Sequence, residues 1–135
     1  MISHVDTSDR PFGLPPPMII TIDLPFPIST NALWSYGRKN VRASAEYTKW
    51  KSAADAIAMV QKTFRGLKTI ETQFIAIILI ADHRKIDVDN CAKSVLDWAQ
   101  SRMLIANDSM CNELTIRKVP LKEVPTGARL IIREI

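Results

Sequence analysis

The segment RKIDVDNCAKSVLDW, Arg84 to Trp98, holds the side chains of this sequence that are best suited to chemistry. Asp87 and Asp89 stand two positions apart where an extended segment is expected to turn into a helix, so both carboxylates can point the same way. Two anions held close together repel each other unless a cation or a proton lies between them. Oxygen ligands of this kind suit Mg²⁺ or Mn²⁺ better than Zn²⁺. The pair is therefore a candidate metal site.

Three further polar residues belong to the same stretch of chain. Lys93 and Asp97 follow Asp89 at four-residue steps, which places all three along one face of the expected helix. Asp108 follows in the turn beyond that helix, and it reaches the helix start only if the chain reverses there.

A second interpretation of these residues stays open. Acidic residues at a helix start complement the helix dipole and cap its free N–H groups, so Asp87, Asp89 and Asn90 also fit a purely structural role. Lys93 then pairs with Asp89 or Asp97 on the helix surface, where such ion pairs contribute about 0.2–0.5 kcal/mol.

The elements that must position these residues follow from the sequence pattern. A chain of 135 residues, 47% hydrophobic and 24% charged, fits one globular domain rather than a disordered protein. We predict a flexible proline-rich leader, 1–17; a strand, 18–24; a long connection; a helix from Ser44 as N-cap to a stop at Gly66; a strand, 70–81; a charged turn, 82–86; a helix, 88–103; and two strands, 113–119 and 128–133, joined as a hairpin. This order predicts an α+β fold, in which a small mixed sheet of about four strands is packed by two main helices in a single domain, 18–135.

The cysteines and the apolar runs limit the cellular setting. Cys91 and Cys111 lie in a sequence without a recognisable secretory signal and lack metal-ligand spacing, so we expect reduced packing residues and a cytoplasmic protein. The longest apolar run, Phe74 to Ala81, is far below the roughly 18 residues of a membrane span. We therefore expect no membrane segment.

The positive charge suggests a polyanionic partner. The net charge is +4, and the segment Arg38 to Lys51 alone holds five cations against one acid. Such a segment can follow the phosphates of a nucleic acid. The candidate DNA-binding residues are Arg38, Lys39, Arg42, Lys49, Arg84, Lys85 and Lys118. Trp34 and Tyr36, beside the basic loop, fit either stacking on unpaired bases or packing within the protein.

Several separate stretches share one family pattern. They are LPFPISTN (Leu24 to Asn31), a basic loop followed by SAEY (Ser44 to Tyr47), DHRK followed by DVDN (Asp82 to Asn90), Lys93 and the acidic turn at Asp108. In this order and spacing the chain, from about Met18 to Ile135, resembles the RusA-type Holliday junction resolvases, small phage and prophage endonucleases that cut four-way DNA junctions.

The resemblance implies a homodimer that hydrolyses phosphodiester bonds of four-way DNA with Mg²⁺, for which Mn²⁺ is a substitute. Asp87, Asp89 and Asp108 match the metal-binding catalytic aspartates of the family, and Lys93 matches its essential lysine. The sequence departs from the family pattern in its longer leader and at Asn107, where an acidic neighbour of Asp108 is expected. Two alternatives stay open: a noncatalytic DNA-binding dimer, as in an inactive prophage relic, and a magnesium-dependent nuclease for flaps or other branched DNA.

Overall fold

The computed structural model describes residues 16–29, 34–36, 41–61 and 68–135, with the backbone alone for 34–36 and 41–43. Its helices and strands, in chain order, are β1 (Ile19–Pro25), β2 (Trp34–Tyr36), β3 (Val41–Ala43), α1 (Ala45–Met59), β4 (Phe74–Ala81), the 3-10 turn η4 (Val88–Asn90), α2 (Ala92–Ser101), the 3-10 turn η5 (Asp108–Met110), β5 (Cys111–Val119), the 3-10 turn η6 (Leu121–Glu123) and β6 (Gly127–Glu134).

Four strands form a mixed sheet in the order β1-β6-β4-β5. β6 runs antiparallel to both β1 and β4, whereas β4 and β5 are parallel. Parallel neighbours need a crossover connection, and α2 with its flanking turns supplies it. The acidic segment before α2 and the turn carrying Asp108 are therefore the two ends of one β-α-β unit.

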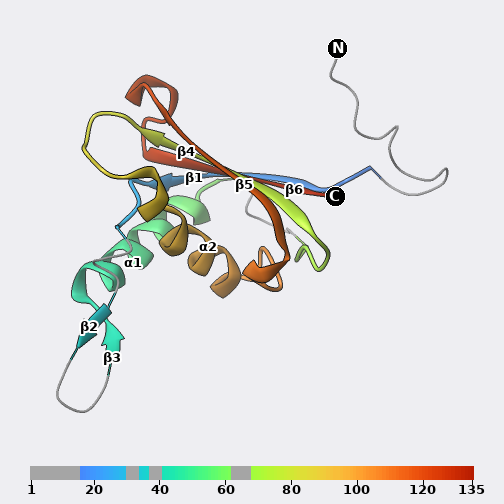
Figure 1. The fold of residues 1–135 in the computed structure, drawn as a ribbon, viewed down its shortest axis with the longest axis horizontal. Helices are drawn as coiled ribbons and strands as arrows, with labels where there is room; N and C mark the ends of the chain where they lie inside the picture. Colours follow the sequence, from blue (N-terminus) through green and yellow to red (C-terminus); the bar gives the residue numbers. More distant parts are fainter. Residues whose placement is uncertain (1–15, 30–33, 37–40, 62–67) are drawn as a thin grey trace.

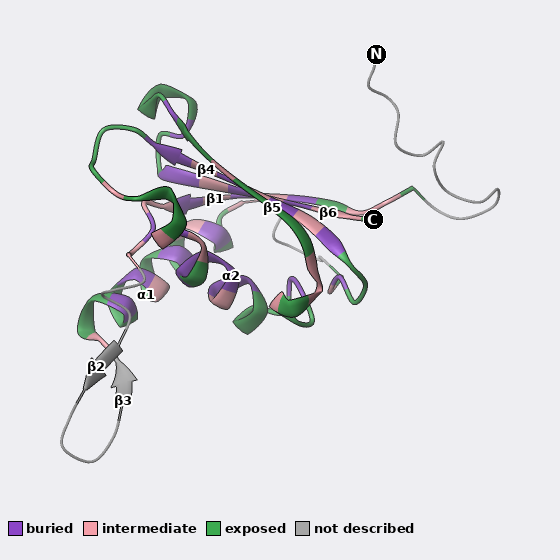
Figure 2. Ribbon diagram, viewed as in Figure 1, coloured by how far each residue is buried: buried purple, intermediate pink, exposed green. Residues whose placement is uncertain are grey.

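Both helices cover the same face of this sheet (Figure 1). Burial alternates along β1, β4 and β6, so one side of each strand packs under the helices, as Figure 2 shows by colour. The core includes Ile22, Ile78 and Leu130 from the sheet and Trp98 from α2, each at most 1% exposed. The α+β architecture and the single small domain predicted from the sequence are confirmed. No helix in the described ranges is long and apolar enough to cross a membrane.

The ends of α1 show how local chemistry fixes this helix. Ser44 is the N-cap, as predicted, and its Oγ accepts the N–H of Tyr47 at 3.0 Å.

The helix ends at Met59 rather than continuing to Gly66. The side chain of Gln61 donates to Ile57 O and also exchanges two hydrogen bonds of 2.8 Å with the backbone of Asp23. This amide pairs with the outer edge of β1 as a neighbouring strand would.

Two predicted connections are wrong. The strands β5 and β6 are adjacent in the sequence but do not form a hairpin, because the fully apolar β4 lies between them and η6 leads the chain around its end. The long connection before Ser44 also contains structure, since β2 and β3 pair as a small antiparallel ribbon. Three-residue strands leave too short a pattern to recognise.

The second helix is shorter than predicted. Val88 to Asn90 form a separate 3-10 turn, and α2 runs from Ala92 to Ser101 instead of from 88 to 103. Val88 is 42% exposed and does not pack in the core. Cys91, Val95 and Ala99, at helical spacing after it, are fully buried.

Candidate active site

The acidic pair lies on the η4 turn, directly before α2. Asp87 has extended backbone angles (φ −74°, ψ 132°), and its carbonyl accepts hydrogen bonds from Asn90 N at 2.9 Å and from the buried Cys91 Sγ at 3.4 Å. These bonds fix the backbone of the turn to the core. Asp87 and Asp89 themselves are exposed.

The two carboxylates do not act as hydrogen-bonding caps. Asp87 occupies the N-cap position of η4 without a side-chain capping bond, and α2 begins after Cys91, which makes no such bond either. Within the described part of the chain, no hydrogen bond or ion pair involves the carboxylate of Asp87 or Asp89. The structural alternative therefore retains the helix dipole but lacks the hydrogen bonds that capping requires.

The chain reverses after α2. From the sequence, such a reversal is required for Asp108 to approach the start of the helix. The helix closes with Met103 N donating to Gln100 O and Leu104 N to Ala99 O, the bonding pattern of a Schellman motif. Met103 takes the left-handed conformation (φ 61°), and Leu104 is buried. Gln100 Oε1 then accepts the N–H of Asp108 at 2.9 Å, so α2 itself holds the turn that carries Asp108.

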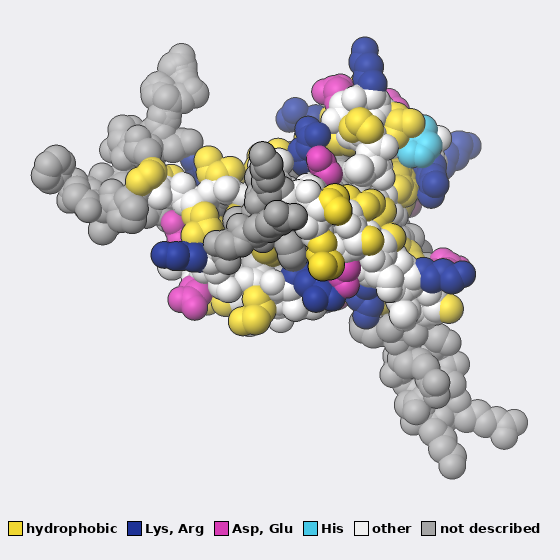
Figure 3. Space-filling model, turned by 180° about the vertical axis from the view of Figure 1, so that it is seen from behind, with side chains coloured by type: hydrophobic (Ala, Val, Ile, Leu, Met, Phe, Trp, Pro, Cys, Tyr) yellow, Lys and Arg dark blue, Asp and Glu magenta, His cyan; other side chains and the backbone are white. Residues whose placement is uncertain are grey.

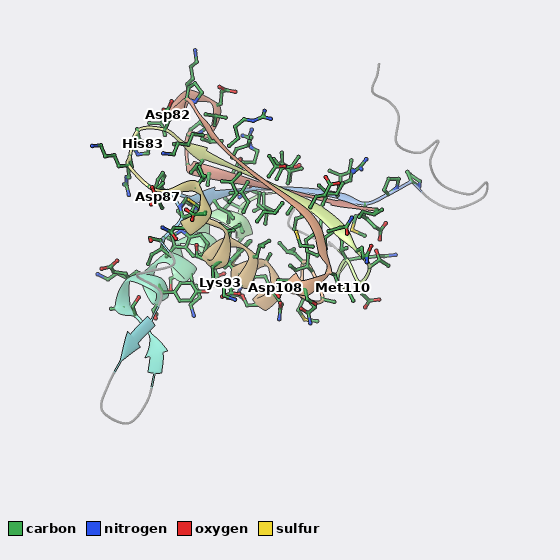
Figure 4. All side chains as sticks on the ribbon, in the orientation of Figure 1. Asp82, His83, Asp87, Lys93, Asp108 and Met110 are labelled. Atoms are coloured by element: carbon green, nitrogen blue, oxygen red, sulfur yellow. The ribbon has the colours of Figure 1, made fainter. Side chains whose placement is uncertain are left out.

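Lys93 links α2 to this returning turn. Its Nζ lies 3.2 Å from Asp97 Oδ1 and 4.0 Å from Asp108 Oδ2, and its side chain is half exposed. Of the two ion-pair partners that the sequence left open, Asp97 is the one that Lys93 contacts. Figure 4 shows Lys93 and Asp108 close to each other, with Asp87 farther along toward the end of β4.

The three aspartates do not form one compact cluster. Among the residues described, no group of three or more His, Cys, Asp or Glu side chains is arranged so that it could hold a metal ion. The donors nevertheless suit magnesium, because all are carboxylate oxygens and those of Asp87 and Asp89 are exposed. Asp108, in contrast, already faces the ammonium group of Lys93.

Asn107, the departure from the family pattern, has a local structural role. It is the N-cap of η5, and its Oδ1 accepts the N–H of Ser109 at 2.9 Å. An aspartate would accept the same hydrogen bond. The shape of this turn therefore does not depend on which of the two residues stands there.

A basic groove lies next to the acidic turn. It has a volume of about 560 Å³, with Phe26, Ile28 and Trp50 among its apolar lining residues. Its charged lining residues are Glu46, Lys49, Arg84 and Lys85, so three of the predicted DNA-binding residues meet here from two distant segments. Figure 3, which shows the molecule from behind, places Lys and Arg side chains around the histidine of the 82–85 loop.

The segment Leu24 to Ser29 holds this groove in place. The carbonyl of Phe26 accepts from Trp50 Nε1 at 2.8 Å, and the carbonyl of Ile28 accepts from the buried Ser94 Oγ at 3.1 Å, so one loop is tied to both helices. The Phe26 ring meets His83 edge-on at 5.5 Å and Arg84 at 5.1 Å. The family resemblance includes this stretch, but only the structure shows that it shapes the groove.

The remaining predicted DNA-binding residues are only partly described. Lys118 is exposed on β5. Burial raises the pKa of the Cys91 thiol to about 11. The charge of Lys118 lowers this pKa, whereas the charges of Asp89 and Asp87 raise it. Lys118 thus lies near the start of α2. Arg38 and Lys39 lie outside the described residues, as do the side chains of Arg42, Trp34 and Tyr36.

Comparison with known proteins identifies the family of this chain. The family model of endodeoxyribonuclease RusA matches residues 25–133, from the end of β1 to near the end of β6. The chain therefore belongs to the RusA endodeoxyribonuclease family, whose activity is the resolution of Holliday junctions. A search of curated proteins gave no match.

Proposed function

We propose that this protein is a magnesium-dependent endonuclease that resolves four-way DNA junctions by paired hydrolysis of phosphodiester bonds. The observation that carries the proposal is the pair of exposed carboxylates, Asp87 and Asp89, fixed by their backbone at the start of α2 within a RusA family chain. Exposed carboxylate oxygens on a turn whose backbone is held by hydrogen bonds are ligands that Mg²⁺ can bind from solvent.

The proposed metal ligands are Asp87, Asp89 and Asp108. Magnesium, when bound, would supply a water molecule of lowered pKa and a positive charge for the phosphate oxygens. Mn²⁺ has a similar preference for oxygen ligands and is the expected substitute. The proposal requires Asp108, which lies across from Lys93, to face the same ion as the two exposed carboxylates.

Lys93 has a separate role in this proposal. Hydrolysis of a phosphodiester places additional negative charge on the phosphate oxygens in the transition state, and a fixed ammonium group stabilises that charge. Lys93 lies in the first turn of α2, its side chain is half exposed, and its Nζ lies 4.0 Å from Asp108 Oδ2. It is therefore a candidate catalytic residue that needs no direct contact with the metal.

DNA is proposed to reach the acidic turn along the basic groove. Lys49 from α1 and Arg84 and Lys85 from the loop before η4 line this groove, and the loop leads directly into Asp87. Phosphates bound in the groove would bring a neighbouring phosphodiester to the turn. Arg38, Lys39, Arg42 and Lys118 are proposed as further DNA contacts.

A homodimer fits the symmetry of the substrate. A four-way junction has near two-fold symmetry, and an isologous dimer presents two active sites related by the same symmetry. Two such sites would make the matched nicks that resolution requires. We further propose that the protein acts in the cytoplasm, where its DNA substrate and a reducing environment for Cys91 and Cys111 are both present.

The nuclease domain is proposed to comprise residues 18–135, with 1–17 as an appended leader. Met18 marks a natural boundary, since its N–H donates to Glu134 Oε1 at 3.2 Å and its carbonyl accepts the N–H of Glu134 at 2.9 Å. A chain lacking Met1 to Pro16 keeps these contacts. Junction cleavage by that chain should stay within a few-fold of the intact protein, and loss of folding or cleavage would refute the boundary.

The function is tested by comparing three DNA substrates at equal concentration: a synthetic mobile four-way junction, a flap and a plain duplex. The proposal predicts paired symmetric nicks in the junction with Mg²⁺ or Mn²⁺ and none in EDTA. Preferred cleavage of the flap would instead indicate a nuclease for other branched DNA. Tight junction binding without nicks in either metal would indicate the noncatalytic alternative.

A further inference from the structure

Asp97 interacts with both a buried aromatic residue and the candidate catalytic lysine. On one side its Oδ1 is 3.2 Å from Lys93 Nζ, and only a quarter of the Asp97 side chain is exposed. On the other side is Tyr47 of α1, which is 4% exposed and whose ring carries Lys51 Nζ at 4.5 Å from its centroid. Burial, then the charge of Asp97 and a hydrogen bond to it, raise the pKa of Tyr47 to about 12.

This arrangement restricts where Lys93 can place its ammonium group. A lysine side chain on a helix surface has many rotamers, and ordering it costs conformational entropy. A carboxylate one turn farther along the helix favours the rotamers that bring Nζ toward it, and that carboxylate is itself held by a buried hydroxyl. In this position Nζ also comes within 4.0 Å of Asp108 Oδ2.

We propose that Asp97 is a positioning residue, which holds the Lys93 ammonium group at the Asp108 side of the site so that it meets the phosphate that is cut. Tyr47, which hydrogen-bonds to Asp97, supports this role by orienting the Asp97 carboxylate. The inference rests on the proposed function and extends it to two residues that touch neither DNA nor metal in the mechanism.

The fold contains a matched arrangement that lacks this connection. Asp55 of α1 accepts the N–H of Trp98 Nε1 at 2.8 Å and also pairs with Arg102. It thus joins the same two helices through an aromatic donor and a cation, as Asp97 does. Asp55, Trp98 and Arg102 all lie outside the candidate site. Neutralising Asp55 should therefore weaken the contact between α1 and α2 and leave the Lys93–Asp97 pair in place.

The test compares Asp97→Asn with Asp55→Asn, both checked for folding by circular dichroism and thermal unfolding. In single-turnover cleavage of the four-way junction, Asp97→Asn should lower the rate about tenfold, as expected for a misplaced charge-stabilising group. Junction affinity in EDTA should stay within about twofold of wild type, because Asp97 contacts no DNA in this scheme. Asp55→Asn should cleave at the wild-type rate.

A double-variant cycle distinguishes positioning from a general structural effect. If Asp97 acts through Lys93, adding Asp97→Asn to Lys93→Ala should cause no further loss of rate. Tyr47→Phe, which keeps the ring and removes the hydroxyl, should show a smaller loss that likewise disappears in the Lys93→Ala background. This pattern would support the inference whatever the absolute rates are.

Three outcomes would overturn the role of Asp97 and leave the proposed function intact. They are equal losses of rate in Asp97→Asn and Asp55→Asn, multiplicative losses when Asp97→Asn is combined with Lys93→Ala, and a wild-type cleavage rate in Asp97→Asn. Absence of cleavage by the wild-type protein would overturn the proposed function, and the positioning role with it.

Discussion

Gly127 lies directly beneath the backbone of Phe26. A Cβ atom added at Gly127 would stand 2.4 Å from Phe26 N and 2.9 Å from Phe26 Cα, and the φ of Gly127 is +121°. Both the space and the conformation require glycine at this position. The contact places Phe26, and with it the wall of the basic groove, against the start of β6.

Gly127→Ala should therefore destabilise the protein by about 2 kcal/mol or more, measured by chemical denaturation. Phe26→Ala should not rescue the variant, because the closest atoms belong to the backbone of Phe26 rather than to its ring. An unchanged free energy of unfolding in Gly127→Ala would show that the loop moves away at little cost.

Met103 is a non-glycine residue in the left-handed conformation at the end of α2, and its side chain is 69% exposed. Replacing it with glycine should raise the free energy of unfolding by about 1 kcal/mol, because L-residues with a Cβ are strained there. Met103→Ala, which keeps the Cβ, is the matched control and should bring no such gain. Equal stability of the two variants would contradict the strain argument.

Lys85 should contribute to junction binding through phosphate contacts. Lys85→Ala is expected to weaken binding in EDTA and to reduce the slope of log affinity against log salt by about 0.9, the value for one phosphate contact. Lys68→Ala is the control, since Lys68 is also exposed but precedes β4, whereas Lys85 follows it. If both variants lose the same affinity, the groove is not the DNA path.

The buried hydroxyl of Tyr47 predicts a loss of stability at high pH. The pKa of this group is about 12 in the folded protein against an ordinary value of 10.0, so between these values the unfolded chain releases a proton that the folded protein retains. Deprotonation then favours unfolding, and stability falls as the pH rises. At pH 11 the titration of Tyr47 should lower the free energy of unfolding by about 1 kcal/mol.

Chemical denaturation at pH 9 and pH 11 measures this effect. Between pH 9 and pH 11, the free energy of unfolding of wild type should fall by about 1 kcal/mol more than that of Tyr47→Phe. Cys91, whose pKa is also raised, contributes to the loss in both proteins and cancels in the comparison. Identical losses in the two proteins would mean that Tyr47 titrates normally and does not interact with Asp97.

The fold was largely predictable because its main elements carry strong local patterns. The continuous apolar run of β4 is typical of a central strand, and the Ser44 cap with the apolar spacing after it marks α1. Which strands are neighbours in the sheet was harder to predict. β5 and β6 are separated by η6 and look like a hairpin in sequence, and only the position of β4 between them excludes that pairing.

The sequence could propose residues for the candidate site but not their arrangement. Asp87, Asp89 and Lys93 follow from spacing and resemblance, whereas the reversal that brings Asp108 to Lys93 depends on Met103 in a conformation that sequence patterns assign to glycine. The sequence also gave no sign of Tyr47, because its partner Asp97 is fifty positions away on another helix.

The most direct test of the central claim, that Asp87 and Asp89 hold a catalytic metal, is cleavage of a mobile four-way junction by wild type and by Asp89→Asn in Mg²⁺. Junction binding in EDTA is measured alongside as the control for folding and DNA contacts. The account predicts paired symmetric nicks by wild type, and undiminished binding without nicks in the variant. Nicks made by Asp89→Asn at the wild-type rate, or none by wild type, would contradict it.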